Sequence, residues 1–251
     1  MGTAPLALAG QTALVTGGAR RVGAEIVRHL HAAGARVAIH FHRSRAEAAA
    51  LAAELNGQRT DSAFVCEADL LQVPTLRALV ADIVARAGGL SILVNSASTF
   101  YPTPLATATA DQWADLMGTN LTAPLFLAQA AAGELKRARG LIVNIADIHG
   151  LRPLANHLIY STAKAALIHL TRGLARELAP EVRVNAIAPG PVLRPEAGLD
   201  EAQKQEIIRH TLLQRAGSPA DVARAVRFFA TDAPFVTGQI LSVDGGRSQR
   251  W

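Results

Sequence analysis

Short apolar runs rich in β-branched residues alternate with longer amphipathic segments along this chain. Residues 12–16 form the first such run, a glycine-rich stretch leads from it into an amphipathic segment ending near Ala33, and a second run follows at 36–41. Parallel strands buried on both faces have nearly continuous apolar sequences, and each pair needs a crossover connection, usually a helix. The alternation therefore predicts an α/β fold in which helices cover both faces of a parallel sheet.

The same pattern continues to the end of the chain and sets the number of strands. With 251 residues, of which 50% are hydrophobic, the chain can bury one large core but leaves little room for two full domains. We therefore predict a single domain over 1–251, with a Rossmann-type, doubly wound sheet of seven parallel strands. The other strands are expected at 62–67, 91–94, 141–146, 182–188 and 240–243.

Composition argues against several classes of protein. The 25 basic and 20 acidic residues give a net charge of +5, but the basic residues are scattered and aromatic residues make up only 4%, which argues against nucleic-acid binding. No targeting signal is evident and no apolar run reaches roughly 18 residues, so we expect a cytoplasmic protein that does not bind membranes. The single cysteine, Cys66, and the scattered histidines offer no intrachain disulfide and no metal site.

The glycine-rich stretch after the first strand has the sequence Gly-Gly-Ala-Arg-Arg-Val-Gly from Gly17 to Gly23. Glycine permits the tight turn and close helix packing, and the free amides and dipole of a helix N-terminus favour a pyrophosphate. Such a turn also occurs as an ordinary strand-to-helix connection, but its place at the first junction of a βαβ unit favours dinucleotide binding. We expect cofactor contacts from Gly17, Arg20, Arg21, Val22 and Gly23.

The end of the second strand bears on the choice of nicotinamide cofactor. Enzymes that use NAD place a carboxylate there, whereas enzymes that use NADP place basic or hydroxyl groups around the 2′-phosphate. Here His42, Arg43 and Ser44 follow the strand, Arg20 is a further candidate for the same phosphate site, and no acid appears before Glu47, so the sequence predicts NADPH. The alternative for Arg43 and Ser44 is a solvated loop in which Ser44 caps the helix from Arg45, although Ser44 can combine capping with phosphate binding.

A second polar cluster follows the strand at 141–146. Asp147 lies directly after that strand, and a helix with one apolar face begins near His157 and carries Tyr160 and Lys164. Residues four apart share a helix face, so the ammonium would lie near the phenol, lower its pKa and prepare it for proton transfer. A half-buried tyrosine beside a solvated lysine would have the same spacing.

Together with the glycine-rich turn, this cluster resembles the short-chain dehydrogenase/reductase family. The resemblance implies that Tyr160 donates or accepts a proton and that Lys164 holds the nicotinamide ribose. It also implies that Asn120, in a helix at 111–133 interrupted near Pro124, holds a water that feeds protons to the lysine. The alternative for Asn120 is an asparagine that bonds backbone at a helix kink. Most members of the family have serine at the position of Asp147.

Other parts of the cofactor site follow from the resemblance alone. Asn95 and Ala97 match the family's motif after the fourth strand, and Pro189, Gly190 and Val192 match the loop that covers the nicotinamide carboxamide. The resemblance also implies a homotetramer and a substrate lid at 193–213. Asp69 would contact adenine or would cap the following helix, and the sequence favours neither.

Four departures from the family average all match the pteridine reductases within it. They are Arg21 in place of a glycine, the His-Phe-His-Arg-Ser segment at 40–44, the Ser-Thr-Phe-Tyr-Pro-Thr-Pro segment at 98–104, and Asp147. In that subfamily the serine and the phenylalanine after the fourth strand contact the pterin, and the phenylalanine ring stacks on it. By position these residues are Ser98 and Phe100.

The chemistry of these side chains agrees with a pterin substrate. A flat, electron-poor bicycle needs an aromatic platform, a cation near its carbonyl and a carboxylate near its amino side, which Phe100, Arg21 and Asp147 supply. His157, one turn before Tyr160, is expected to line the same pocket. Phe100 could instead be a core ring.

The function that follows is NADPH-dependent reduction of a dihydrobiopterin-, dihydromonapterin- or dihydrofolate-type substrate to its tetrahydropterin. Two alternatives remain open from the sequence. One is a carbonyl or 3-oxoacyl-thioester reductase on the same fold, although an ionised Asp147 can only accept hydrogen bonds and would replace serine poorly. The other is an NADPH-sensing binding protein without activity.

Overall fold

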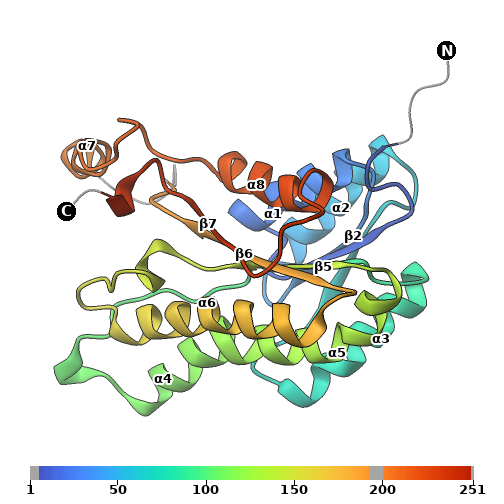
Figure 1. Ribbon diagram of the computed structural model, residues 1–251, viewed down its shortest axis with the longest axis horizontal. Helices are drawn as coiled ribbons and strands as arrows, with labels where there is room; N and C mark the ends of the chain where they lie inside the picture. The colour runs from blue at the N-terminus through green and yellow to red at the C-terminus, as the bar shows by residue number, and fades with distance from the viewer. Residues whose placement is uncertain (1–5, 193–199, 250–251) are drawn as a thin grey trace.

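The computed structural model describes residues 6–192 and 200–249, and its centre is one sheet of seven parallel strands (Figure 1). The strand order is β3-β2-β1-β4-β5-β6-β7. The predicted fold is confirmed, and each strand begins and ends within one residue of its predicted bounds. The strands are β1 (Thr12–Val15), β2 (Arg36–Phe41), β3 (Ala63–Glu67), β4 (Ile92–Asn95), β5 (Leu141–Ile145), β6 (Arg183–Pro189) and β7 (Ile240–Val243).

Helices cover both faces of this sheet, as Figure 1 shows. Neighbouring strand residues point to opposite faces, so Leu14 and Val15 of β1 belong to two separate buried clusters. The cluster that contains Val15 packs against α1 (Arg21–Ala32), α2 (Arg45–Gln58) and α8 (Pro219–Thr231). The cluster that contains Leu14 packs against α3 (Leu76–Ala87), α5 (Ala123–Arg137) and α6 (Leu158–Leu178).

The order in which successive strands are added to the sheet reverses at β1: β2 and β3 lie on one side of it, and β4 to β7 lie on the other. This strand pairs with β2 on one side and with β4 on the other, in parallel register. Ligands of doubly wound sheets bind in the crevice outside the carboxyl ends of the strands at such a reversal. The turn after β1 and the loop after β4 meet there, because Thr16 Oγ1 accepts hydrogen bonds from Ser96 N (2.9 Å) and Ala97 N (3.0 Å).

The helix expected at 111–133 is interrupted, but earlier than predicted. The structure has α4 (Ala110–Met117), a π-helical turn (Gly118–Thr122) and then α5. Pro124 lies in the first turn of α5, where a helix needs no amide donor, and so it does not cause the break. The break coincides instead with Asn120, whose Nδ2 donates to Leu116 O at 2.9 Å.

The remaining elements are short or peripheral. The expected lid at 193–213 is described only from 200 onward, where it contains α7 (Glu201–Arg209), and its part at 193–199 lies outside the described residues. No helix in the described part of the chain is long and apolar enough to cross a membrane. Short 3₁₀ turns occupy Val73–Thr75, Leu105–Thr107, Ile148–Gly150 and Arg247–Gln249.

Candidate active site

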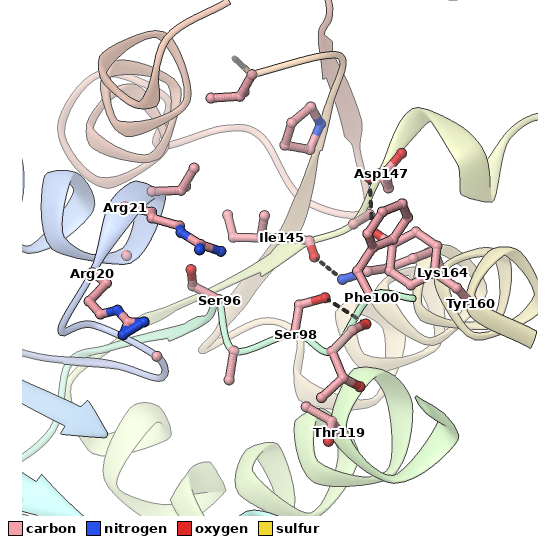
Figure 2. Close-up of a pocket in the computed structure, with 18 of the residues that line it drawn as sticks. Arg20, Arg21, Ser96, Ser98, Phe100, Thr119, Ile145, Asp147, Tyr160 and Lys164 are labelled. Atoms are coloured by element: carbon pink, nitrogen blue, oxygen red, sulfur yellow. Dashed lines mark hydrogen bonds between the residues drawn. The ribbon is translucent and has the colours of Figure 1, made fainter. Parts of the chain in front are cut away.

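A cavity of about 1210 Å³ opens at the carboxyl ends of the strands (Figure 2). Pockets for single small molecules have volumes of roughly 300–1,000 Å³, so this one has room for a dinucleotide beside a second small ligand. The structure brings most of the predicted site residues together along its wall. These are Gly17, Arg20, Arg21, Val22, Gly23, His42, Arg43, Ser44, Asp69, Ala97, Ser98, Phe100, Asp147, Tyr160, Lys164, Pro189, Gly190 and Val192.

The glycine-rich turn has the close packing that its sequence predicts. A Cβ atom on Gly23 would lie 2.1 Å from Gly17 O, so no side chain fits there, and Gly17 itself has a φ of +61°. Helix α1 begins at Arg21 with no acidic residue in its first turn. Its positive end and the adjacent Arg20 therefore suit the negative charge of a pyrophosphate.

Arg21 holds an unusual backbone conformation in this turn. Its φ of 53° lies in the left-handed region of backbone conformations, which residues other than glycine rarely adopt. The guanidinium nevertheless faces the cavity, between the glycine-rich turn and the loop after β4 (Figure 2). Strained backbone of this kind is concentrated at functional sites.

His40 is a site residue that the sequence analysis did not assign. It is 2% exposed at the end of β2, and its Nδ1 accepts a hydrogen bond from Gly17 N at 3.1 Å. Its Nε2 lies 3.1 Å from Ala68 O, to which it donates. Burial lowers the pKa of His40 to about 4, so the ring is neutral near pH 7. The sequence signal for this role was a histidine inside an otherwise apolar strand that lies next to β1, where the strand order reverses.

The loop after β2 and the loop after β3 form the far end of the cavity. His42 and Arg43 are exposed and line it. Ser44 occupies the N-cap position of α2 but makes no capping hydrogen bond with its side chain, so the capping alternative is wrong for it. Asp69 also lines the cavity, and its Oδ1 accepts from Leu71 N at 3.0 Å. Gln72, and not Asp69, occupies the N-cap position of the next helical turn, without a capping hydrogen bond from its side chain.

Tyr160, Asp147 and Lys164 form the opposite end of the cavity (Figure 2). The phenol of Tyr160 donates to Asp147 Oδ2 at 2.8 Å, and Asp147 Oδ1 accepts from His149 N at 2.8 Å. Lys164 is 2% exposed and donates to Ile145 O at 2.9 Å, with its Nζ 5.6 Å from the centroid of the Tyr160 ring. Burial lowers the pKa of Lys164 to about 8, against the opposing effect of the Asp147 carboxylate.

Phe100 is not a core residue, because 45% of it is exposed at the cavity wall. The His157 ring stacks on it with centroids 4.7 Å apart and planes 13° apart, and the Tyr160 ring meets it edge-on at 4.8 Å. His157 thus supports Phe100 and does not itself line the cavity. Such stacked and edge-on pairs add stability beyond the area they bury.

Asn95 and Asn120 were also expected in the site, yet neither lines the cavity. Asn95 is buried in the sheet, where its Nδ2 donates to Asn144 Oδ1 at 2.8 Å. Asn120 is fully buried and bonds backbone at the helix interruption, as in the alternative given for it above. Its part in a proton relay stays a prediction.

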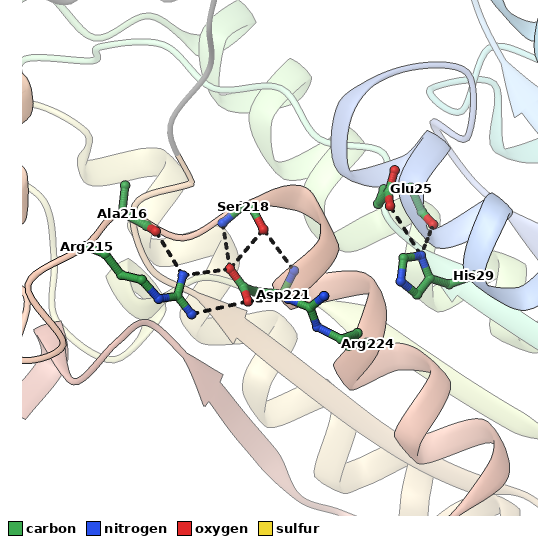
Figure 3. A network of polar contacts seen from close by, with 7 residues as sticks. All are labelled: Glu25, His29, Arg215, Ala216, Ser218, Asp221 and Arg224. Atoms are coloured by element: carbon green, nitrogen blue, oxygen red, sulfur yellow. Dashed lines mark hydrogen bonds and ion pairs between the residues drawn. The ribbon is translucent and has the colours of Figure 1, made fainter.

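Pro219, in the first turn of α8, lines the cavity, and Figure 3 shows the polar contacts around the start of this helix. Ser218 and Asp221 form a capping box there, in which each side chain accepts from the other residue's backbone amide. Arg215 (3.1 Å) and Arg224 (2.7 Å) both pair with the carboxylate of Asp221. The hydrogen bond from Arg215 is the main reason that the pKa of Asp221 is held well below its usual range.

Comparison with known proteins agrees with this geometry. A family model described as enoyl-(acyl carrier protein) reductase matches residues 17–248. Pteridine reductase 1 of Leishmania tarentolae is 37% identical over 288 residues, covering 99% of this chain and 99% of that protein. The 3-oxoacyl-acyl-carrier-protein reductase of Staphylococcus aureus is 32% identical over 240 residues, covering 94% of this chain and 97% of that protein.

A solved structure has the same fold. The blue fluorescent protein from a metagenomic library, crystallised in complex with NADPH, superimposes with a TM-score of 0.90 at 35% identity, covering 96% of this chain and 98% of that one. Within the described residues, no group of histidine, cysteine and acidic side chains could hold a metal ion. The sheet order, the glycine-rich turn, the Tyr160–Lys164 pair and these full-length similarities place the chain in the short-chain dehydrogenase/reductase family of NAD(P)H-dependent oxidoreductases.

Proposed function

We propose that this protein reduces dihydropterins to tetrahydropterins with NADPH. The observation that carries the proposal is the hydrogen bond between Tyr160 and Asp147, because most of the family has serine in place of this carboxylate. The full-length similarity to a pteridine reductase supports the same substrate class. The physiological substrate would be of the dihydrobiopterin, dihydromonapterin or dihydrofolate type.

The cavity wall supports a flat heteroaromatic substrate. The exposed Phe100 ring, held from behind by His157, offers a platform for stacking beside the Tyr160 hydroxyl. Arg21 faces the same space and supplies a cation for a ring carbonyl. Asp147 can accept hydrogen bonds from an amino group while it also accepts from Tyr160.

NADPH is the cofactor we propose, and when bound it supplies the hydride for a ring carbon. The Gly17–Gly23 turn and the start of α1 would hold its pyrophosphate, while Arg43 and Ser44 would hold its 2′-phosphate. Asp69 would lie on the adenine side, and Pro189, Gly190 and Val192 on the nicotinamide side. The absence of an acid between Phe41 and Glu47 supports NADPH over NADH.

Tyr160 would deliver the proton that completes the reduction. Its hydroxyl lies at the cavity wall and is held by Asp147, and Lys164 lies close enough to stabilise the phenolate that proton transfer leaves behind. A pKa of about 8 lets Lys164 exchange a proton near physiological pH, so it can take part in restoring the Tyr160 proton. Asp147 orients the hydroxyl until the substrate ring nitrogen replaces it as the acceptor.

A carbonyl or 3-oxoacyl-thioester reductase is the second candidate, and the Staphylococcus aureus relative favours it. That reaction needs Tyr160, Lys164 and a further donor to the carbonyl oxygen. Asp147 occupies the place of that donor and, when ionised, only accepts. The geometry therefore favours the pterin over the carbonyl substrate.

One assay distinguishes the pterin reductase, the carbonyl or thioester reductase and the NADPH-sensing protein. NADPH oxidation by the purified protein is followed with dihydrobiopterin, dihydrofolate and an acetoacetyl thioester as substrates. We expect turnover with at least one dihydropterin and little with the thioester. Thioester turnover alone would favour the carbonyl reductase, and NADPH binding without any turnover would favour a sensing protein.

We also propose that the protein is a homotetramer. Strand β7 is at the edge of the sheet, and β7, α8 and the segment between them expose Leu241, Phe228 and Phe235. Exposed apolar groups beside an open strand edge favour association. Light scattering coupled to size-exclusion chromatography should give four times the chain mass, and a monomer mass would contradict the proposal.

A further inference from the structure

The helix that carries Tyr160 begins without a cap from its own N-cap residue. His157 occupies that position in α6, and its side chain makes no capping hydrogen bond. Its Nδ1 lies 2.9 Å from Ala155 O, and its ring stacks on Phe100. The first amide groups of a helix have no acceptor within the helix and need one from outside. Tyr160 is the third residue of α6, so an acceptor for these amides also bears on where its hydroxyl lies.

Thr103, in the loop after β4, supplies such an acceptor. It is fully buried, and its Oγ1 accepts from Ile159 N at 3.4 Å. Its backbone amide donates to Asn156 O at 2.6 Å, and it pairs with His157 in a parallel bridge. Because Ile159 is also buried, its amide would lose this acceptor without gaining one from water if the Thr103 hydroxyl were removed. Thr103 thus joins the loop after β4 to both sides of the start of α6.

The segment that ends at Thr103 also carries the aromatic platform of the site. Phe100 lies three positions earlier, and its ring meets the Tyr160 ring edge-on with centroids 4.8 Å apart (Figure 2). Tyr101, the next residue, packs against the buried cluster that contains Tyr160, and its hydroxyl donates to Asp115 Oδ2 at 2.8 Å. The segment from Phe100 to Thr103 is therefore attached to the start of α6 at both of its ends.

We propose that Thr103 is a positioning residue, which holds the Tyr160 hydroxyl at a fixed place relative to a ring stacked on Phe100. The inference rests on the proposed function and deepens it, because this spacing matters only for a substrate that stacks while it receives the proton. Thr103 itself does not line the cavity, so it acts through Phe100 and Tyr160. Proton transfer requires the donor within hydrogen-bond reach of the acceptor, and a displacement of about 1 Å can cost on the order of a hundredfold in rate.

The test uses two substitutions that each change one half of the Thr103 side chain. Thr103→Val replaces the hydroxyl by a methyl group, and Thr103→Ser keeps the hydroxyl and removes the methyl group. Steady-state kinetics with a dihydropterin and titration with NADPH are measured for both. We expect Thr103→Val to lower kcat roughly tenfold, with KM changed much less and NADPH affinity unchanged, and Thr103→Ser to keep kcat close to that of the wild type.

Thr109→Val is the matched control, because Thr109 Oγ1 caps α4 by accepting from Gln112 N at 3.2 Å. This variant loses helix capping away from α6 and should lower the melting temperature without changing kcat. A Thr103→Val protein with a lower melting temperature and wild-type kcat would show capping alone and overturn the proposal. If Thr103→Val does not fold, Thr103→Ser decides: a retained kcat at a lower melting temperature supports the role of the hydroxyl, and a roughly tenfold loss of kcat overturns it.

A double variant, Thr103→Val with Phe100→Ala, tests whether Thr103 acts through the stacked ring. Independent defects add as free energies, so their effects on kcat multiply. We expect instead that Thr103→Val has a much smaller effect once Phe100 is absent, since no stacked ring is left to align with Tyr160. A double variant whose loss of kcat equals the product of the two single losses would contradict the coupling.

The two proposals fail in different ways. Dihydropterin turnover by the wild type, with an undiminished kcat in Thr103→Val, would support the proposed function and overturn the role of Thr103. A wild type that reduces no dihydropterin would overturn both, because no stacked substrate would then receive the proton of Tyr160.

Discussion

The phenol of Tyr160 donates a hydrogen bond to the carboxylate of Asp147 at 2.8 Å, at one end of the cavity. Lys164, which shares the helix face of Tyr160, donates instead to Ile145 O at 2.9 Å. The carboxylate opposes formation of the phenolate and the ammonium favours it. With Asp147 in place of serine, this site has more hydrogen-bond acceptors than the site of most family members.

The first prediction concerns the choice of cofactor. NADPH should be preferred over NADH, and Arg43→Ala should remove most of that preference because it would remove the charged contact that we propose for the 2′-phosphate. Such a contact contributes about 1.5–3 kcal/mol, which corresponds to roughly ten- to a hundredfold in affinity. Titration of both cofactors measures it. Arg45→Ala, which removes a neighbouring arginine outside the cavity, is the control, and an Arg43→Ala protein that still prefers NADPH would disprove the assignment.

The second prediction concerns the aromatic platform. Phe100→Ala should raise the KM for dihydropterins and weaken antifolates such as methotrexate, because stacking contributes about 0.5–1.5 kcal/mol beyond buried area. The melting temperature should change little, since 45% of Phe100 is exposed. Steady-state kinetics and thermal melting measure the two effects, with Leu105→Ala as a control at an exposed apolar residue outside the cavity. Unchanged kinetics with a lower melting temperature would show a purely structural role.

The third prediction follows from the backbone of Arg21. Its φ of 53° costs about 1–3 kcal/mol for a residue with a side chain, and glycine avoids most of that cost. Arg21→Gly should therefore raise the free energy of unfolding while it weakens cofactor and substrate binding. Urea denaturation and NADPH titration measure the two changes. Arg139→Gly, at another arginine with a positive φ of 49°, should raise stability without affecting binding; a destabilised Arg21→Gly protein would contradict this account.

The fourth prediction concerns His40 and pH. The folded protein holds the pKa of His40 at about 4, below the value of 6.5 for an ordinary histidine, so between these values the unfolded chain binds more protons. The contribution of His40 to the free energy of unfolding is fully present above pH 6.5. It is lost as the pH falls towards 4, which lowers the free energy of unfolding by up to about 3 kcal/mol. NADPH affinity should fall only as the pH approaches 4, where the folded protein itself takes up the proton, because a protonated Nδ1 cannot accept from Gly17 N.

Urea denaturation between pH 7 and 4.5 and NADPH titration extended down to about pH 4 test this prediction. His40→Gln should reduce the pH dependence of both quantities. His31→Gln is the matched control: His31 is also buried and its pKa is also lowered by burial, but it bonds Ser62 and does not line the cavity. The control should alter only stability, and an unchanged NADPH profile in His40→Gln would refute the link to Gly17.

Local patterns in the sequence predicted the strands and the glycine-rich turn because both depend on neighbouring residues. Continuous apolar runs indicate buried parallel strands, and glycine at 17 and 23 indicates a turn with no space for side chains. The contacts of His40 and Asn120 depend instead on residues more than 20 positions away, such as Gly17 and Ser98. Asn95 was expected at the cofactor because it matches the family's motif after the fourth strand, but its side chain is paired with Asn144 of the neighbouring strand.

The most direct test of the account replaces Asp147 by the serine of the wider family. Asp147→Ser removes the acceptor of the Tyr160 proton, and kcat/KM is measured over pH for a dihydropterin and an acetoacetyl thioester. We predict that dihydropterin reduction falls by about two orders of magnitude, the scale of a general acid–base contribution, while weak thioester reduction is gained. Wild-type dihydropterin turnover in Asp147→Ser, with an unshifted pH profile, would contradict the central role of this carboxylate.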